Sequence, residues 1–289
     1  MSETARDTTR IRFPPSFVPR LQRLVGRLSA ERARCEGAGG GALEGGGDEF
    51  VGHRAWRPGD ELRDLDWNLL ARFDEPFVRV HRREAGERWA LLLDTSASMG
   101  LGRPPKLQRA AEVASGLAFV GRAAGAHVRL HAMRDGEPVS RGLRSPAELR
   151  GWLAFLEGLR AAGTGGLRPL LERIPARCER VFLIGDLFDL APAEAIALGR
   201  PGRGVDVVRV LAPRELAPGA EHLQVEWLDP ETGEHLDVAL DGDVRRRYER
   251  VLARHLEDWR ATCARHRVAH GAWSSARPFE DLVRGVLFR

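Results

Sequence analysis

The chain has almost no lysine. Among its 289 residues, arginine supplies nearly all of the positive charge, and Lys106 is the only lysine. Arginine and lysine together number 45 against 41 aspartates and glutamates, which leaves a formal net charge of only +4. A nucleic-acid-binding surface normally carries a clear excess of positive charge. The near balance of acids and bases therefore argues against an arginine-rich nucleic-acid binder.

Cysteines and long apolar runs are also scarce. Cys35, Cys178 and Cys263 are odd in number, far apart and outside any metal-ligand spacing, which argues against a disulfide framework. No apolar run approaches the roughly 20 residues that span a bilayer, and the opening residues, MSETARDTTRIR, lack the apolar centre of a signal peptide. We therefore expect a soluble, reduced, cytoplasmic protein without a membrane span.

The most informative stretch covers residues 89–100 and reads WALLLDTSASMG. Its apolar part has the length of a buried strand and stops at Asp94, and hydroxyl groups follow at Ser96 and Ser98. Such a cluster of hard oxygen atoms suits a small divalent cation. The competing interpretation is a strand-to-turn junction in which these side chains only cap the following backbone.

Strand-like and helix-like segments alternate after this stretch, which predicts an α/β fold with a mostly parallel sheet and right-handed crossovers. We expect this main domain to cover residues 88–289. The predicted segments are strands at 89–93, 127–133, 181–184, 205–211 and 268–274, and helices at 106–123, 146–159, 243–267 and 279–287.

Two further regions precede the main domain. Residues 1–49 read as a short amphipathic helix followed by a glycine-rich connection. Residues 50–87 predict a small β-subdomain with strands at 51–56 and 77–81, and we expect a hairpin over 223–240 to join it. Its interleaved acids and arginines are either a carboxylate pair for acid–base chemistry or a charge network that fixes the subdomain, and we favour the second. The acids are Asp60, Glu61, Asp64 and Asp66.

Two later features strengthen the metal interpretation. Thr164 lies between glycines in a loop, and Asp186 follows the apolar strand predicted at 181–184, as Asp94 follows its own strand. The carboxyl ends of parallel strands share one edge of the sheet, where open α/β folds build their sites. Carboxylates crowded there would repel each other, and a divalent cation would remove that cost.

The motif DTSAS at residues 94–98, together with Thr164 and Asp186, resembles the metal-ion-dependent adhesion site of von Willebrand factor A domains. The upstream segment at residues 57–67, RPGDELRDLDW, with Ala71-Arg72 and Glu84, resembles the signature of the bacterial domain-of-unknown-function 58 (DUF58) family. The resemblance covers roughly Phe50 to the C-terminus. It implies a von Willebrand A-like, Rossmann-type sheet with helices on both faces and a small β-subdomain.

The resemblance also implies a function. Ser96, Ser98 and Thr164 would supply hydroxyl ligands, and Asp94 and Asp186 carboxylates, to Mg²⁺ or Mn²⁺. An acidic residue of a partner protein would complete the coordination, and relatives of this family are commonly linked to MoxR-type AAA+ ATPases. We expect a noncatalytic adaptor without catalytic residues. The alternative is a Mg²⁺-dependent phosphoester hydrolase, against which we note no second metal cluster and no evident general base in the sequence.

Overall fold

The computed structural model describes residues 10–36, 44–56, 66–73, 75–82, 86–218 and 223–288. The chain divides into two compact units, one formed by residues 1–28 and 87–289 and the other by residues 29–86. We call them the larger and the smaller unit. The smaller unit is close to the predicted β-subdomain, but it begins within the first helix rather than at residue 50.

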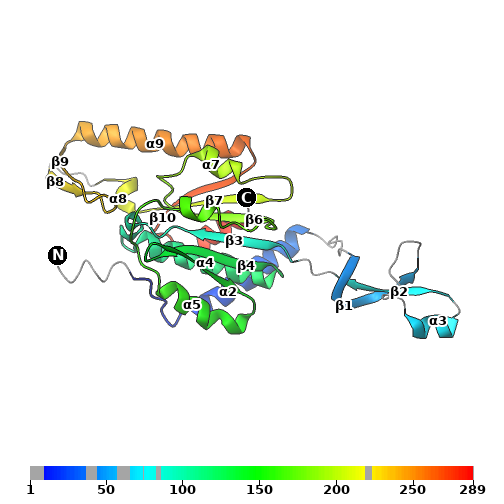
Figure 1. Ribbon diagram of the computed structural model, residues 1–289. Coiled ribbons are helices and arrows are strands. Elements are labelled where there is room, and N and C mark those ends of the chain that lie inside the picture. The colour runs from blue at the N-terminus through cyan, green and yellow to red at the C-terminus, as the bar shows by residue number, and fades with distance from the viewer. Residues whose placement is uncertain are drawn as a thin grey trace. The chain divides into compact units, whose positions relative to one another are not determined.

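The larger unit is built on a six-stranded sheet with the order β10-β7-β6-β3-β4-β5 (Figure 1). Neighbouring strands are parallel except for β5, which is antiparallel to β4 at one edge. The predicted α/β class and mostly parallel sheet are thus confirmed. The strands are β3 (Arg88–Leu93), β4 (His127–Arg134), β5 (Glu137–Leu143), β6 (Arg180–Gly185), β7 (Gly204–Leu211) and β10 (Ala269–Ser274).

Helices cover both faces of the sheet because its central strands are apolar on both sides. Along β3, Trp89, Leu91 and Leu93 belong to one core cluster, whereas Ala90 and Leu92 belong to the other. The first cluster is closed by α2 (Phe17–Glu36), α4 (Lys106–Ala123), α5 (Leu149–Glu157) and α10 (Phe279–Leu287). The second is closed by α6 (Arg168–Leu171), α7 (Pro192–Ala197) and α9 (Gly242–Arg265).

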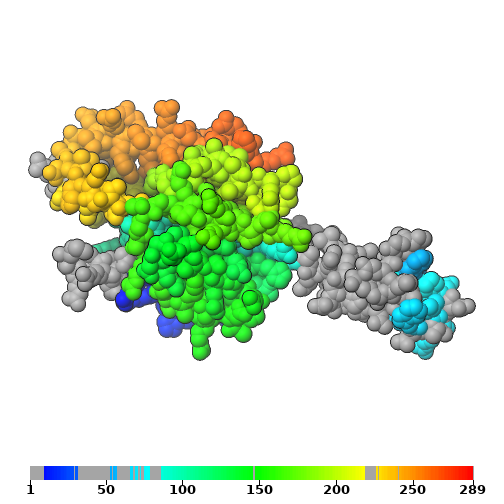
Figure 2. All heavy atoms as spheres, viewed as in Figure 1, coloured from blue at the N-terminus to red at the C-terminus, as the bar shows by residue number. Residues whose placement is uncertain are grey.

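Helix α9 lies along the surface of the larger unit, where its orange residues form a continuous band (Figure 2). Only Leu252, Trp259 and Cys263 of this helix are buried. Its first residue follows Asp241, whose carboxylate accepts hydrogen bonds from the amides of Asp243 and Val244 as an N-cap. No helix in the described part of the chain is both long enough and apolar enough to cross a membrane.

The predicted hairpin over 223–240 is present as β8 (Leu223–Leu228) and β9 (His235–Leu240), which are antiparallel. These two strands form a two-stranded sheet of their own and belong to the larger unit. The pairing with the strands of residues 50–87 that we expected does not occur among the described strands. Alternation of apolar and polar residues identifies strands, but it does not say which edges meet.

In the smaller unit, β1 (Glu44–Ala55) pairs antiparallel with β2 (Phe77–Arg82), and the short helix α3 (Trp67–Phe73) lies between them in the sequence. Strand β1 begins inside the stretch expected to be a glycine-rich connection. The buried Asp66 caps α3, because its Oδ1 accepts from the Leu69 amide at 3.2 Å while its Oδ2 is 2.9 Å from His53 Nε2. Residues 57–65, which contain the other three acids of the expected charge network, lie outside the described residues.

Candidate metal site

Asp94 is fully buried and follows β3 directly, at the centre of the sheet. Its amide donates to the Ile184 carbonyl at 2.8 Å, so the β3–β6 pairing continues one residue past the strand. From β3 the chain first adds β4 on one side and later adds β6 on the other. This is a topological switch point, where open α/β sheets leave room for a ligand beyond the carboxyl ends of the strands.

Four of the five predicted ligands are joined by a continuous series of hydrogen bonds. The Ser96 amide donates to Asp94 Oδ1 at 2.8 Å, and the Ser96 and Ser98 hydroxyls are 3.1 Å apart. The Ser98 hydroxyl donates to Asp186 Oδ2 at 2.9 Å. The ends of β3 and β6 therefore place two carboxylates and two hydroxyls together, as the sequence predicted.

The second carboxylate oxygen of Asp94 is the unusual atom of this cluster. Oδ2 is buried and has no hydrogen-bond partner among the described residues. Burial, and then repulsion by Asp186, raises the pKa of Asp94 to about 7 despite the hydrogen bonds from Ser96 that favour the ionised form. A buried acceptor without a donor is costly, so such an atom calls for a proton or a cation.

Gly185, the last residue of β6, makes this arrangement sterically possible. A Cβ atom at this position would lie 2.5 Å from the Asp94 Cβ and 2.8 Å from Asp94 Oδ2. The Asp94 side chain therefore rests directly on the backbone of the neighbouring strand. Only glycine leaves that space.

Thr164 is carried to the same edge by its loop. The Ala162 amide donates to the Thr95 carbonyl at 2.9 Å, and the Ala97 amide donates to the Gly163 carbonyl at 3.0 Å. The loop is thus hydrogen-bonded to Thr95 and Ala97, the residues directly before and after Ser96. The Thr164 side chain is exposed, and within the described residues its hydroxyl makes no hydrogen bond.

The backbone after Asp186 turns sharply. Leu187 has a φ of 57°, in the left-handed region that costs a non-glycine residue roughly 1–2 kcal/mol. Its side chain is fully buried in the second core cluster, which holds the turn in place. The Phe188 amide then points back to Asp186 Oδ1 at 3.4 Å, and Arg209 Nε donates to the Asp186 carbonyl at 2.9 Å.

The structure adds a cation that the sequence analysis did not connect with the site. Lys106, at the start of α4, is fully buried, and its Nζ lies 2.7 Å from Asp186 Oδ2 and 2.5 Å from Glu215 Oε1. Burial alone would lower the pKa of Lys106, but the attraction of the two carboxylates outweighs it and raises the pKa. Its uniqueness as the only lysine was visible in the sequence, whereas its partners were not.

A third carboxylate lies near the site. Asp189 packs against the backbone of Gly166, where a Cβ atom would come within 2.6 Å of its carboxylate oxygens. Burial raises the pKa of Asp189. Even so, no group of three or more His, Cys, Asp or Glu side chains in the described residues is arranged to hold a metal ion. A metal here would therefore depend on hydroxyl ligands as well as on carboxylates.

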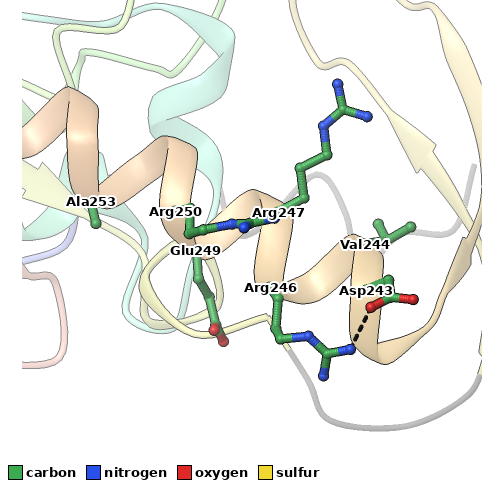
Figure 3. Close-up of a pocket in the computed structure, with 7 residues that line it drawn as sticks. All are labelled: Asp243, Val244, Arg246, Arg247, Glu249, Arg250 and Ala253. Carbon is green, nitrogen blue, oxygen red and sulfur yellow. Dashed lines mark hydrogen bonds and ion pairs between the residues drawn. The ribbon is translucent and has the colours of Figure 1, made fainter.

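A surface depression lies on helix α9 of the larger unit. It has a volume of about 730 Å³ and is lined by α9 alone, with three arginine and two acidic side chains (Figure 3). One of the arginines, Arg246, pairs with Asp243 of the preceding turn. None of these residues belongs to the candidate metal site. The lining residues are Asp243, Val244, Arg246, Arg247, Glu249, Arg250 and Ala253.

Comparison with known families identifies the chain's relatives. A family model described as "Protein of unknown function DUF58" matches residues 52–258, from β1 to α9. The chain belongs to the DUF58 family. The resemblance seen in the sequence is confirmed at this level, and all five predicted ligands of this DUF58 protein lie within the matched range.

Individual relatives are more distant. The uncharacterized protein Rv1480 of Mycobacterium tuberculosis is 27% identical over 234 residues, covering 75% of this chain and 72% of the relative. The uncharacterized protein Mb1516 of Mycobacterium bovis is similar to the same extent. Neither name states an activity, so the function of this DUF58 protein has to be argued from its own site.

Proposed function

We propose that this DUF58 protein is a noncatalytic, metal-dependent protein-interaction module of the von Willebrand A type. Asp94, Ser96, Ser98, Thr164 and Asp186 would form its metal-ion-dependent adhesion site and hold Mg²⁺ or Mn²⁺. The observation that carries the proposal is the buried, unpartnered Oδ2 of Asp94, which lies in a cluster that also contains two hydroxyls and the Asp186 carboxylate. This donor set is the one that hard divalent cations prefer.

The residues of the chain define what such a site would do. Three of the five ligands from this chain are neutral hydroxyls, so only two carboxylates would face the divalent cation, and the Lys106 ammonium already pairs with one of them, Asp186. The exposed Thr164 loop is hydrogen-bonded to Thr95 and Ala97, on either side of Ser96. A bound cation would supply a coordination position that an acidic side chain of another protein can fill.

The family resemblance suggests the partner. We propose that the protein works in the cytoplasm as an adaptor for a MoxR-type AAA+ ATPase, in the assembly or maturation of a client complex. The acidic residue that reaches the metal would come from the ATPase or from the client. The chain's own role is then to present the metal face and to hold its ligands rigidly on the sheet.

The test has two parts. Calorimetry should detect binding of Mn²⁺ and Mg²⁺ to the wild-type protein and no binding to Asp94→Ala, with the circular dichroism spectrum unchanged. A purified MoxR-type ATPase from the same organism should then bind in Mg²⁺ and dissociate in chelator. Undiminished metal binding by Asp94→Ala would refute the assignment of the site.

The same preparations distinguish the adaptor from the alternative enzyme. A Mg²⁺-dependent phosphoester hydrolase would turn over a panel of phosphoesters and lose that activity in Ser96→Ala. We expect no turnover above that of the variant. Robust turnover that depends on Ser96 would replace the adaptor proposal with the hydrolase.

A further inference from the structure

Lys106 is an unusual group to find inside this protein. It is the only lysine of the chain, its side chain has no exposed surface, and it lies at the first residue of α4. Burying an ammonium group is unfavourable unless carboxylates pair with it. Asp186 and Glu215 do so from two sides, at 2.7 Å and 2.5 Å.

One oxygen of Asp186 is shared between this cation and the candidate metal site. Asp186 Oδ2 accepts from Lys106 Nζ and also from the Ser98 hydroxyl, a proposed metal ligand. A positive charge held at this distance weakens the attraction of the carboxylate for any other cation nearby. Lys106 and a metal ion would therefore act on the same carboxylate.

Glu215 is held firmly on the other side of the ammonium group. Its Oε2 accepts from the Ala212 amide at 2.6 Å, at the start of α8 (Pro213–Leu216). Its carbonyl accepts from the Tyr248 hydroxyl of α9 at 2.8 Å. The Glu215 carboxylate thus has a fixed position, from which it shares the charge of Lys106 with Asp186.

We propose that Lys106 is a built-in cation that competes with the metal ion for Asp186, and that Glu215 sets the strength of this competition. Without a metal, the ammonium group pairs with a carboxylate that is almost fully buried. When a metal ion binds, the positive charge of Lys106 lowers the affinity of the site for that ion. This inference rests on the proposed function, because it concerns the affinity of the proposed site.

The competition makes opposite predictions for the two partners of the ion pair. In Lys106→Gln the competing charge is gone, so Mn²⁺ should bind about tenfold more tightly or better. In Glu215→Gln the ammonium group acts on Asp186 alone, so Mn²⁺ should bind about tenfold more weakly. The double variant, which keeps the wild-type net charge, should bind within about threefold of wild type.

The control variants come from a partly buried ion pair in the same unit, Arg20–Glu280, whose atoms are 2.7 Å apart. Arg20→Gln and Glu280→Gln change the net charge in the same way, and neither should change the affinity. All variants are titrated with MnCl₂ by calorimetry, and their melting temperatures are measured in chelator. If the Lys106 ion pair were purely structural, Lys106→Gln and Glu215→Gln would both lower the melting temperature. Their Mn²⁺ affinities would then not shift in opposite directions.

The outcomes separate this inference from the proposed function. Metal binding by the wild type with equal affinities in Lys106→Gln and Glu215→Gln, or with both weakened, overturns the role of Lys106 and leaves the site standing. Absence of binding in the wild type and in every variant overturns both. If Lys106→Gln does not fold, Glu215→Gln still decides, because an affinity equal to that of Glu280→Gln contradicts the proposal.

Discussion

The two carboxylate oxygens of Asp94 have different surroundings. One carboxylate oxygen is satisfied by the Ser96 amide and the other is buried without a donor among the described residues. The surroundings therefore favour either a protonated Asp94 or a cation beside it. A purely structural aspartate at a strand end would have both oxygens hydrogen-bonded or exposed to water.

The metal-free protein should lose stability as the pH rises toward neutrality. The pKa of Asp94 is raised from 3.8 to about 7 in the folded state, so folding favours its protonated form. That contribution is fully present below about pH 4 and is lost as the pH rises through about 7, with a maximum of about 4 kcal/mol. Asp94→Asn, which stays neutral, should remove most of this loss.

Urea unfolding between pH 5 and pH 8 in chelator measures this effect. The control is Asp281→Asn, at an exposed position of α10, which should reproduce the wild-type profile. Parallel pH profiles for wild type and Asp94→Asn would mean that Asp94 is ionised at no cost in the folded protein. The argument for a cation at this position would then fail.

Thr164 allows ligand binding to be separated from stability. Its side chain is exposed and makes no hydrogen bond within the described residues, so the nearly isosteric Thr164→Val should change the free energy of unfolding by less than about 0.5 kcal/mol. If the hydroxyl is a ligand, Mn²⁺ affinity should nevertheless fall about tenfold, or by about 1.4 kcal/mol. Calorimetry and urea unfolding on one preparation give both numbers, and an unchanged affinity would remove Thr164 from the ligand set.

The carboxylates of the site could be predicted from the sequence because each directly follows an apolar strand. Parallel strands place their carboxyl ends at one edge, so Asp94 and Asp186 had to be near each other. Lys106 and Glu215 could not be found in this way. They are 109 residues apart and come from a helix start and a one-turn helix, and only the packed structure brings them to Asp186.

Among the secondary-structure elements, those with a strong apolar period were predicted well. The bounds of α4 and α10 agree with the predicted helices at 106–123 and 279–287. Strand β5 was missed because its residues, EPVSRGL, are mostly exposed or half-buried and lack a clear apolar alternation. It is an antiparallel edge strand, whose only sheet neighbour is β4.

Strand β6 depends on glycine at its last position. In Gly185→Ala the new methyl group would have to displace the Asp94 side chain, so we expect a loss of about 1–3 kcal/mol in stability and much weaker Mn²⁺ binding. Gly204→Ala at the start of β7 is the matched control, because a Cβ atom there would meet only the Glu179 carbonyl, at an ordinary contact distance of 3.9 Å. Urea unfolding and calorimetry check both variants, and equal behaviour of the two would mean that Asp94 does not need its present position.

At the level of the whole molecule, every proposed ligand belongs to the larger unit, and none lies in the smaller one. Anything that binds only the folded state stabilises it, by about 2.7 kcal/mol at a ligand concentration one hundred times the dissociation constant. A metal bound at the sheet edge should therefore stabilise the elements that carry its ligands. These are the segments after β3 and β6 and the loop around Thr164.

Hydrogen exchange with mass-spectrometric detection can follow this stabilisation along the chain. Saturating Mn²⁺ should slow exchange in peptides that cover residues 94–100, 162–168 and 185–190, and in the flanking strands β3 and β6. Peptides from β1 and β2 should exchange at the same rate with and without the metal, since no ligand lies there. Asp94→Ala should abolish the protection at all three segments together, because one cation joins them. Protection that persists in that variant, or that appears only at one segment, would mean that the three loops do not share a single ion.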